Sequence, residues 1–224
     1  MTRAVVIAVD GTAASGKGTL AKRLARHFHF AHLDSGSLYR LTALTVIEAG
    51  GDPAVESDAV AGARKLDPGR SNDSAIRTDR IAQAASVVAA FPAVRSLLLN
   101  FQRSFAAEPP NNAGGAVIDG RDIGTVVCPE ADAKIFVDAK PEVRARRRWQ
   151  ELRASGASPD EAAVLADIQA RDKRDRERAV APLRPATDAI LLDTTDLDID
   201  AAFARALALV TPKVEEALKA RHRG

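Results

Sequence analysis

The sequence predicts an α/β protein built around one parallel sheet of about five strands. Five short apolar runs are typical of strands, and stretches with helical periodicity separate most of them. The runs are Ala4–Val9, Phe30–Leu33, Ala116–Ile118, Lys134–Val137 and Ala189–Leu192. Strands joined through helices form a parallel sheet with helices on both faces, which makes a three-layer fold. Each run is followed directly by an aspartate, and ligands of such sheets bind beyond the carboxyl ends of the strands.

Helices are predicted from apolar spacing and from start and stop signals. Leu20, Leu24 and Phe28 recur every four residues and give one buried stripe after the first strand. Further helices are expected at Gly36–Ala49, at Asp79–Ala90 behind the N-cap Thr78, from Pro92 to about Ala107, from Pro141 to before Gly156, and from a Ser158–Glu161 capping box to about Val180. A last helix starts at Asp198 or Asp200, and we expect Thr211-Pro212 to kink or interrupt it.

Two segments lack a core pattern. Asp52–Ala75 and Glu108–Gly115 are rich in Gly, Pro, Asn and Asp and show little periodicity. We therefore expect both to be surface connections, and neither to form a separate domain.

Composition limits the class of protein. The chain has 224 residues, 46% of them hydrophobic, which is enough for one sizeable core. Its formal net charge of +2 argues against bulk binding to nucleic acid or membranes. Its one cysteine excludes an internal disulfide framework and suits a reducing compartment. No apolar run approaches the ~20 residues of a membrane span, so a cytoplasmic protein is expected.

A phosphate-binding loop is predicted between the first strand and its helix. The segment Gly11–Thr19 joins the two and carries a lysine at the helix start. Backbone amides of such a loop converge on an anion, and the lysine reaches the terminal phosphates. The alternative is an ordinary glycine-rich turn. The preceding strand, the residue spacing, the lysine and the following helix all favour a phosphate-binding loop instead. We therefore predict an ATP site formed by Gly11, Thr12, Ala13, Ala14, Ser15, Gly16, Lys17, Gly18 and Thr19.

The residue after the lysine narrows the type of P-loop. A hydroxyl residue usually stands there to meet Mg²⁺, whereas here Gly18 occupies the position and Thr19 follows. Gly-Lys-Gly-Thr is similar to the loop of adenylate-kinase-like nucleoside monophosphate kinases. The guanine-reading pattern Asn-Lys-x-Asp is absent from the sequence. We expect a small-molecule kinase that uses Mg²⁺, with Thr19 as the metal contact and Asp119 as the alternative.

A kinase also needs a site for the phosphate acceptor, and arginines supply candidates. Asp34–Arg40 follows the second strand, and Asp119–Asp122 follows the third. Arg171, Arg174, Asp175 and Arg178 project from one face of a predicted helix. Arginine offers the planar bidentate geometry that phosphates select. The alternatives are a solvated helix face with ion pairs, an ordinary turn at Asp119–Asp122, and a plain helix cap at Ser35.

Taken together, these motifs show that the sequence resembles the bacterial cytidylate kinases. Those enzymes transfer the γ-phosphoryl group of ATP to CMP and dCMP. The similarity covers nearly the whole chain. It rests on Asp10–Leu20, Leu33–Gly36 with Tyr39-Arg40, Ala84–Arg95, Asp119–Val127, Arg171-Asp172, Arg174–Arg176, Arg178–Leu183 and Asp193–Thr195.

The resemblance implies roles for individual residues. Arg95 and Ser86 would face O2 and N3 of cytosine, and Asp122 and Ser35 its amino group, which matches the donors and acceptors of that base. Arg95 could instead be a surface residue of the helix that begins at Pro92. Residues implied to bind the acceptor phosphate are Arg40, Arg121 and Arg171, and those near the ribose and the transferring group are Asp175 and Arg178. The implied catalytic residues are Lys17, Arg121, Arg171 and Arg178.

The resemblance also implies a single kinase domain over residues 1–224, with a core of 1–50, 86–140 and 185–224. A monophosphate-binding insert would occupy about 51–85 and a helical lid about 146–180. Many family members carry a longer insert with a small β-sheet, so the insert here is reduced. We expect a monomer whose partners are ATP, CMP and dCMP, without nucleic acid or membrane.

Other functions stay open at this point. A related kinase could act on UMP, AMP or shikimate. An arginine-rich RNA- or DNA-binding module is disfavoured by the near-neutral charge and by the 4% aromatic content. A nucleotide sensor without turnover would not need a second set of arginines.

Overall fold

The computed structural model of the chain describes residues 3–154 and 156–221. The chain divides into two compact units, one of residues 34–105 and the other of the segments on either side.

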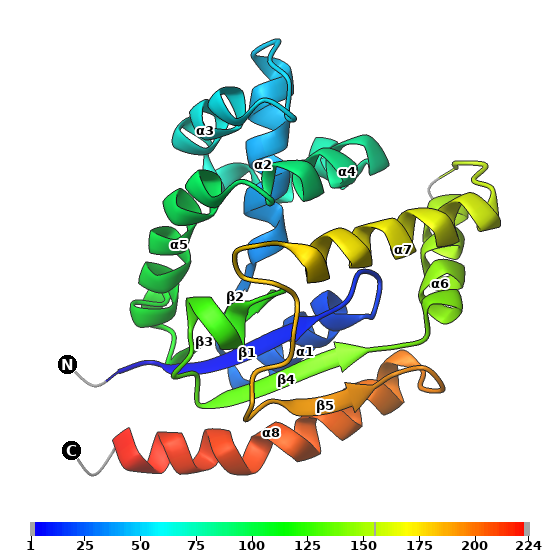
Figure 1. Cartoon of the computed structure of the whole chain (residues 1–224). Coiled ribbons are helices and arrows are strands. Elements are labelled where there is room, and N and C mark those ends of the chain that lie inside the picture. The colour runs from blue at the N-terminus through cyan, green and yellow to red at the C-terminus, as the bar shows by residue number, and fades with distance from the viewer. Residues whose placement is uncertain (1–2, 155, 222–224) are drawn as a thin grey trace. The chain divides into compact units, whose positions relative to one another are not determined.

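The larger unit contains a five-stranded sheet, as the sequence predicts (Figure 1). Its strand order is β2-β3-β1-β4-β5. The strands are β1 (Val5–Gly11), β2 (Ala31–Asp34), β3 (Gly115–Gly120), β4 (Ala133–Asp138) and β5 (Ile190–Asp193). β1 pairs in parallel with β3 and β4, and β4 with β5. Every residue of β1 and β3 is buried, which explains why both runs are apolar on successive positions.

One face of this sheet is covered by α1 (Lys17–Phe28) and α8 (Ile199–Arg221). Ile7 of β1, Leu24 of α1 and Val210 of α8 are fully buried in the core that they share. Each such side chain contributes about 1.5–3 kcal/mol of hydrophobic free energy. The same packing fixes α1, whose first turn follows the predicted phosphate loop.

The interruption expected at Pro212 is wrong, because α8 is one continuous helix from Ile199 to Arg221 (Figure 1). A kink at Pro212 stays a prediction. Val210 and Val214 on either side are fully buried in the sheet core. Tertiary packing of these neighbours therefore outweighs the missing amide.

A pair of helices, α6 (Pro141–Ala154) and α7 (Glu161–Glu177), also belongs to the larger unit. Ala145, Val164 and Ile168 form a small core between them. The predicted capping box at Ser158 is wrong, because Asp160 is the N-cap and accepts a hydrogen bond from the Ala163 amide at 3.1 Å. A carboxylate one residue before the first turn satisfies that amide and also favours the helix dipole.

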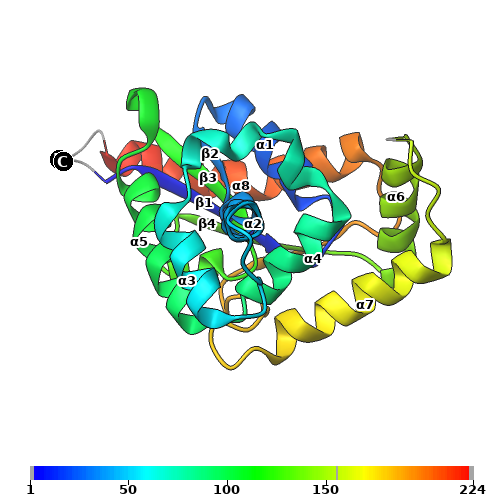
Figure 2. The same ribbon diagram turned by 90° about the horizontal axis from the view of Figure 1, so that it is seen from above.

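The smaller unit is helical, with α2 (Ser35–Glu48), α3 (Glu56–Lys65), α4 (Asp79–Val88) and most of α5 (Pro92–Ala107). Figure 2 looks along α2 and shows α3 and α4 on different sides of it. Thr78 caps α4 as predicted. The prediction of a surface connection over 52–75 is wrong for α3, which packs against α2.

Small residues explain why α3 was missed. Its buried positions are Ala59, Gly62 and Ala63, which give almost no hydrophobic signal. A Cβ atom at Gly62 would lie 2.5 Å from Val46 Cγ2 on α2, so the two helices approach closely there. Close packing through small side chains leaves little trace in a sequence pattern.

Within the described ranges, no single helix has the length and hydropathy of a membrane span. Only the bent pair Asp79–Val88 and Pro92–Asn112 passes that test together, across a bend of 101°.

Candidate active site

The predicted phosphate loop connects β1 with α1 in the larger unit. Gly11 ends β1 at φ 155°, and a Cβ atom there would lie 2.0 Å from Val137 O of β4. Only glycine allows that approach. Ala14 and Gly16 both have positive φ, at 57° and 87°. Left-handed residues at alternate positions curve the backbone into a nest whose amides face an anion.

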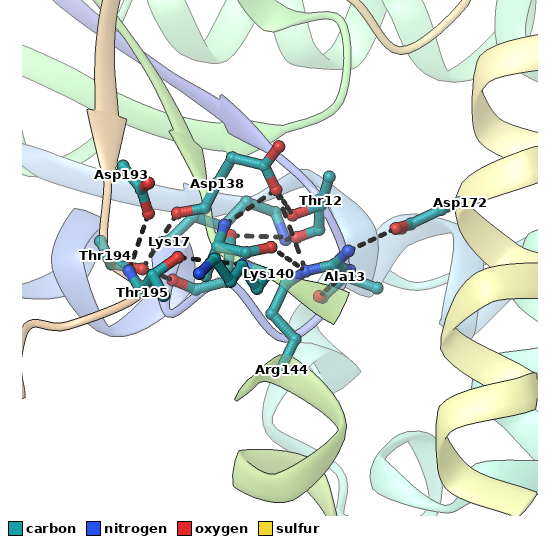
Figure 3. Close-up of polar contacts among 12 residues, drawn as sticks. Thr12, Ala13, Lys17, Asp138, Lys140, Arg144, Asp172, Asp193, Thr194 and Thr195 are labelled. Atoms are coloured by element: carbon teal, nitrogen blue, oxygen red, sulfur yellow. Dashed lines mark hydrogen bonds and ion pairs between the residues drawn. The ribbon is translucent and has the colours of Figure 1, made fainter. Parts of the chain in front are cut away.

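Side chains hold the carbonyl groups of this loop (Figure 3). Three carbonyl oxygens accept hydrogen bonds from donors that lie around the loop. The bonds are Ser15 Oγ to Thr12 O at 3.0 Å, Lys17 Nζ to Thr12 O at 3.3 Å, Arg144 Nη1 to Ala13 O at 3.1 Å, and Thr194 Oγ1 to Ser15 O at 3.1 Å. In a planar trans peptide the N–H points opposite to the C=O. The amides of Ala13, Ala14 and Gly16 are therefore turned away from these donors.

The two residues predicted as Mg²⁺ contacts, Thr19 and Asp119, belong to the first turn of α1 and the end of β3. Thr19 is exposed, one residue after Gly18. Asp119 Oδ2, at the end of β3, lies 3.5 Å from where a Cβ atom of Gly18 would be. Asp119 Oδ1 lies 2.8 Å from His32 Nε2. A hydroxyl and a carboxylate beside the phosphate loop are ligands that Mg²⁺ prefers.

No group of three His, Cys, Asp or Glu side chains that could hold a metal is found among the described residues.

Asp10 organises the turn that follows β3. Its two carboxylate oxygens accept hydrogen bonds from the Ile123 and Gly124 amides, each at 2.7 Å. These amides begin the π-helical turn η4 (Ile123–Val127), directly after Arg121-Asp122. Burial raises the pKa of Asp10 to about 7, although the two amide hydrogen bonds oppose the shift. The sequence marked Asp10 only as a strand-end aspartate, and its role as the anchor of this turn was missed.

Three predicted arginines gather around one carboxylate in the larger unit. Arg121 Nε donates to Asp175 Oδ2 at 2.8 Å, and Arg178 Nη1 lies 3.9 Å from Asp175 Oδ1. Burial acts to raise the pKa of Asp175, but Arg121, Arg171 and Arg178 outweigh it and lower that pKa. Three guanidinium groups against one carboxylate leave a net positive site, which attracts anions.

The alternative that these residues form a solvated helix face with ion pairs is therefore wrong for part of α7. The side chains of Asp175 and Arg178 are each only 6% exposed. Arg174, predicted on the same helix face, is exposed instead. The helix also ends at Glu177 rather than near Val180, because Arg178 has extended backbone angles.

The smaller unit holds three of the four residues predicted to recognise the acceptor base, all except Asp122. Ser86 of α4 and Arg95 of α5 are both buried. The Arg95 guanidinium lies 5.5 Å from the centre of the Tyr39 ring, and its Nη1 donates to Ala89 O at 3.3 Å. The alternative of a surface role for Arg95 is thus wrong.

Ser35 and Arg40 belong to α2 in the same unit. Ser35 is buried, and the cap of α2 is Asp34, whose Oδ1 accepts from the Ser37 amide at 3.2 Å. The alternative that Ser35 is a plain helix cap is wrong. Arg40 is half-buried, with Nη1 donating to Ile76 O at 3.4 Å. Asp122, by contrast, is buried in the larger unit beside Arg121.

Sequence reasoning missed one arginine that touches the phosphate loop. Arg144 of α6 is buried, and it bonds to Ala13 O and to Asp172 of α7. In sequence it stands in an arginine-rich run with Arg146, Arg147 and Arg148. Composition gives no signal that separates the buried arginine of this run from the others.

Comparison with known proteins agrees with this geometry. The cytidylate kinase family model matches residues 7–212. A cytidylate kinase from Nitrobacter winogradskyi is 59% identical over 206 residues, covering 92% of this chain and 95% of the relative. One from Rhodospirillum rubrum is 53% identical over 212 residues, covering 95% of this chain and all of the relative. A solved structure of an uncharacterized protein from Eubacterium ventriosum shares the fold, with a TM-score of 0.53 at 17% identity over 92% of this chain and 98% of that one.

Proposed function

We infer, since this chain belongs to the cytidylate kinase family, that it transfers the γ-phosphoryl group of ATP to CMP and dCMP. An oxygen of the acceptor phosphate attacks the γ-phosphorus in line with the bond to the β–γ bridging oxygen. That bond breaks, and the products are CDP or dCDP together with ADP.

The observation that carries the proposed mechanism is the arginine cluster around Asp175. Phosphoryl transfer needs alignment and neutralisation of charge on the moving oxygens, and it needs little covalent chemistry from the protein. Arg121, Arg171 and Arg178 supply three guanidinium groups, and Asp175 fixes Arg121 through a 2.8 Å bond. One arginine in such a role is worth about 10³–10⁵ in rate.

ATP would be held by the phosphate loop of the same unit. The amides of Ala13, Ala14 and Gly16 face away from the donors that hold the loop carbonyls. Lys17 at the start of α1, whose ammonium donates to Thr12 O in this structure, would turn from that carbonyl to the β- and γ-phosphates. Mg²⁺ would lie near Thr19 and Asp119 and, when bound, would neutralise charge on those phosphates.

Recognition of cytosine is proposed for the buried pair Ser86 and Arg95. A hydroxyl and a guanidinium offer donors for O2 and N3 of cytosine. Uracil carries a proton on N3, which would face the Arg95 donors. A site built from buried hydrogen bonds can reject such a mismatch by ~10⁴-fold. The roles of Ser35, Arg40 and Asp122, and a lid at about 146–180, remain predictions.

We propose a cytoplasmic enzyme that acts as a monomer. Cys128 is the one cysteine of the sequence and can form no internal disulfide, which fits a reducing compartment. Size-exclusion chromatography of the purified protein tests the monomer. We expect the protein to elute at the volume of a globular standard with the mass of one chain.

The proposed activity is tested by the consumption of ATP with CMP, dCMP, UMP and AMP at equal concentration. We expect rapid turnover of CMP and dCMP, and turnover of UMP slower by two or more orders of magnitude. Absence of turnover with CMP would reject the proposal. Faster turnover of UMP or AMP would assign the chain to a related reaction.

A further inference from the structure

Arg144 is the largest fully buried side chain of the described residues, with 1% of its surface exposed. Its guanidinium donates three hydrogen bonds to three different segments (Figure 3). The acceptors are Ala139 O at 2.7 Å, Ala13 O at 3.1 Å and Asp172 Oδ2 at 2.7 Å. One side chain of α6 thus joins the phosphate loop, the segment after β4, and α7.

The contact with Ala13 determines the direction of a loop amide. Ala13 O and the Ala14 N–H belong to one planar peptide and point in opposite directions. By holding the oxygen, Arg144 turns the Ala14 N–H away from α6. The Ala14 side chain also packs against the small α6–α7 core, although Ala14 has the unfavourable φ of 57°. Contacts with these two helices therefore maintain a strained loop conformation.

The contact with Asp172 joins this peptide to the helix of the arginine cluster. Asp172 is buried, and its Oδ1 has no hydrogen-bond partner among the described side chains and backbone. Arg176 approaches the same carboxylate only to 4.0 Å. Arg144 is thus the main compensating charge. Asp172 follows Arg171 directly, and Asp175, which holds Arg121, lies one turn further along α7.

We propose that Arg144 is a positioning residue for the donor nucleotide. It holds the Ala13–Ala14 peptide in the orientation that binds phosphate, and it fixes α7 relative to that loop. It has this effect without touching ATP. The inference rests on the proposed function, because it assumes that the loop binds the phosphates of ATP.

The test compares the affinities for ATP and CMP, measured by titration calorimetry, and the turnover number. Arg144→Lys keeps a positive charge beside Asp172, but its donors all sit on one nitrogen and cannot reproduce the planar fork that reaches three separate acceptors. We expect its Kd for ATP to rise about tenfold and kcat to fall at least tenfold, as for the loss of one or two charge-assisted hydrogen bonds. The Kd for CMP should stay within twofold of the wild-type value.

A second variant distinguishes the loss of the Arg144 contacts from misfolding of the protein. Arg144→Met combined with Asp172→Leu removes both buried charges and fills their space with apolar groups, a change that folded proteins often tolerate. We expect the same loss of ATP affinity. The matched control is Arg3→Lys, since Arg3 also donates to a carbonyl and a carboxylate, those of Glu130 and Asp132, at the opposite end of β1. We expect no change in that control.

Two results would overturn the proposal. One is a wild-type Kd for ATP in both folded Arg144 variants. The other is an equal loss of affinity for ATP and CMP, which would indicate general structural damage. A wild-type enzyme that binds ATP but does not phosphorylate CMP would instead reject the proposed function and leave the comparison of ATP affinities intact.

Discussion

Single residues show where charge and burial compete in this molecule. Asp10 lies inside the sheet and accepts two short hydrogen bonds from backbone amides, which favour its ionised form. Burial acts in the opposite direction and prevails, so its pKa rises from 3.8 to about 7. The folded protein therefore binds this proton more tightly than the unfolded chain does.

This shift predicts a pH dependence of stability. A carboxyl group with a raised folded-state pKa contributes stability that is complete below its unfolded pKa of 3.8 and is lost as the pH rises through about 7. The free energy of unfolding of the wild type should fall by about 1.4 kcal/mol per pH unit from this group between those limits. The Asp10→Asn variant has no ionisable group at this position, so its stability lacks this contribution to the pH dependence.

Urea unfolding of both proteins at several values between pH 4.5 and pH 8 measures the effect. The difference in unfolding free energy, wild type minus variant, should decrease up to about pH 7 and then level off. A difference that stays constant, or that grows with pH, would contradict the raised pKa.

Secondary-structure elements show what a sequence pattern can and cannot reveal. All five strands were predicted to within two residues. The three central strands, β3, β1 and β4, are runs buried in the sheet, and the edge strands β2 and β5 are short runs with one buried residue each. α3 was missed because Ala59, Gly62 and Ala63 pack through their small size. The start of α7 was misplaced because two residues, Ser158 and Asp160, both suit an N-cap, and only the folded geometry selects Asp160.

α8 leads to a prediction at this scale. Pro212 lies inside the helix and cannot donate the backbone hydrogen bond to Ala208 O. Pro212→Ala restores that donor and should stabilise the protein by roughly 1 kcal/mol, part of the ~3 kcal/mol that a mid-helix proline costs. The melting temperature is expected to rise by a few degrees.

Pro141→Ala is the matched control. Pro141 is the first residue of α6, where a missing amide costs nothing and the fixed φ helps. The melting temperature of this variant should stay the same or decrease slightly. A lower melting temperature for Pro212→Ala would show that the proline itself is needed for the packing around Val210 and Val214.

At the scale of the whole molecule, the chemistry was predictable where it is local in sequence. The phosphate loop, its lysine and its helix lie within a few consecutive residues, so spacing alone identified them. The arginine cluster joins residues 54 positions apart, Arg121 and Asp175. The residue pattern made its members candidates, and the family resemblance gave them their predicted roles. Arg144 was not found, because a buried and an exposed arginine look alike in an arginine-rich helix.

In the proposed mechanism, guanidinium groups around Asp175 neutralise the phosphoryl group in transit. Arg178 is the residue to change, because its buried side chain approaches Asp175 and donates to Ala181 O at 3.0 Å. The measurement is the steady-state kinetics of CMP phosphorylation by Arg178→Ala, beside Arg184→Ala, an exposed arginine nearby. We expect kcat to fall about 10³-fold for Arg178→Ala, with the KM for ATP raised less than tenfold, and wild-type values for Arg184→Ala. An unchanged kcat in folded Arg178→Ala would show that this guanidinium does not stabilise the transferring group.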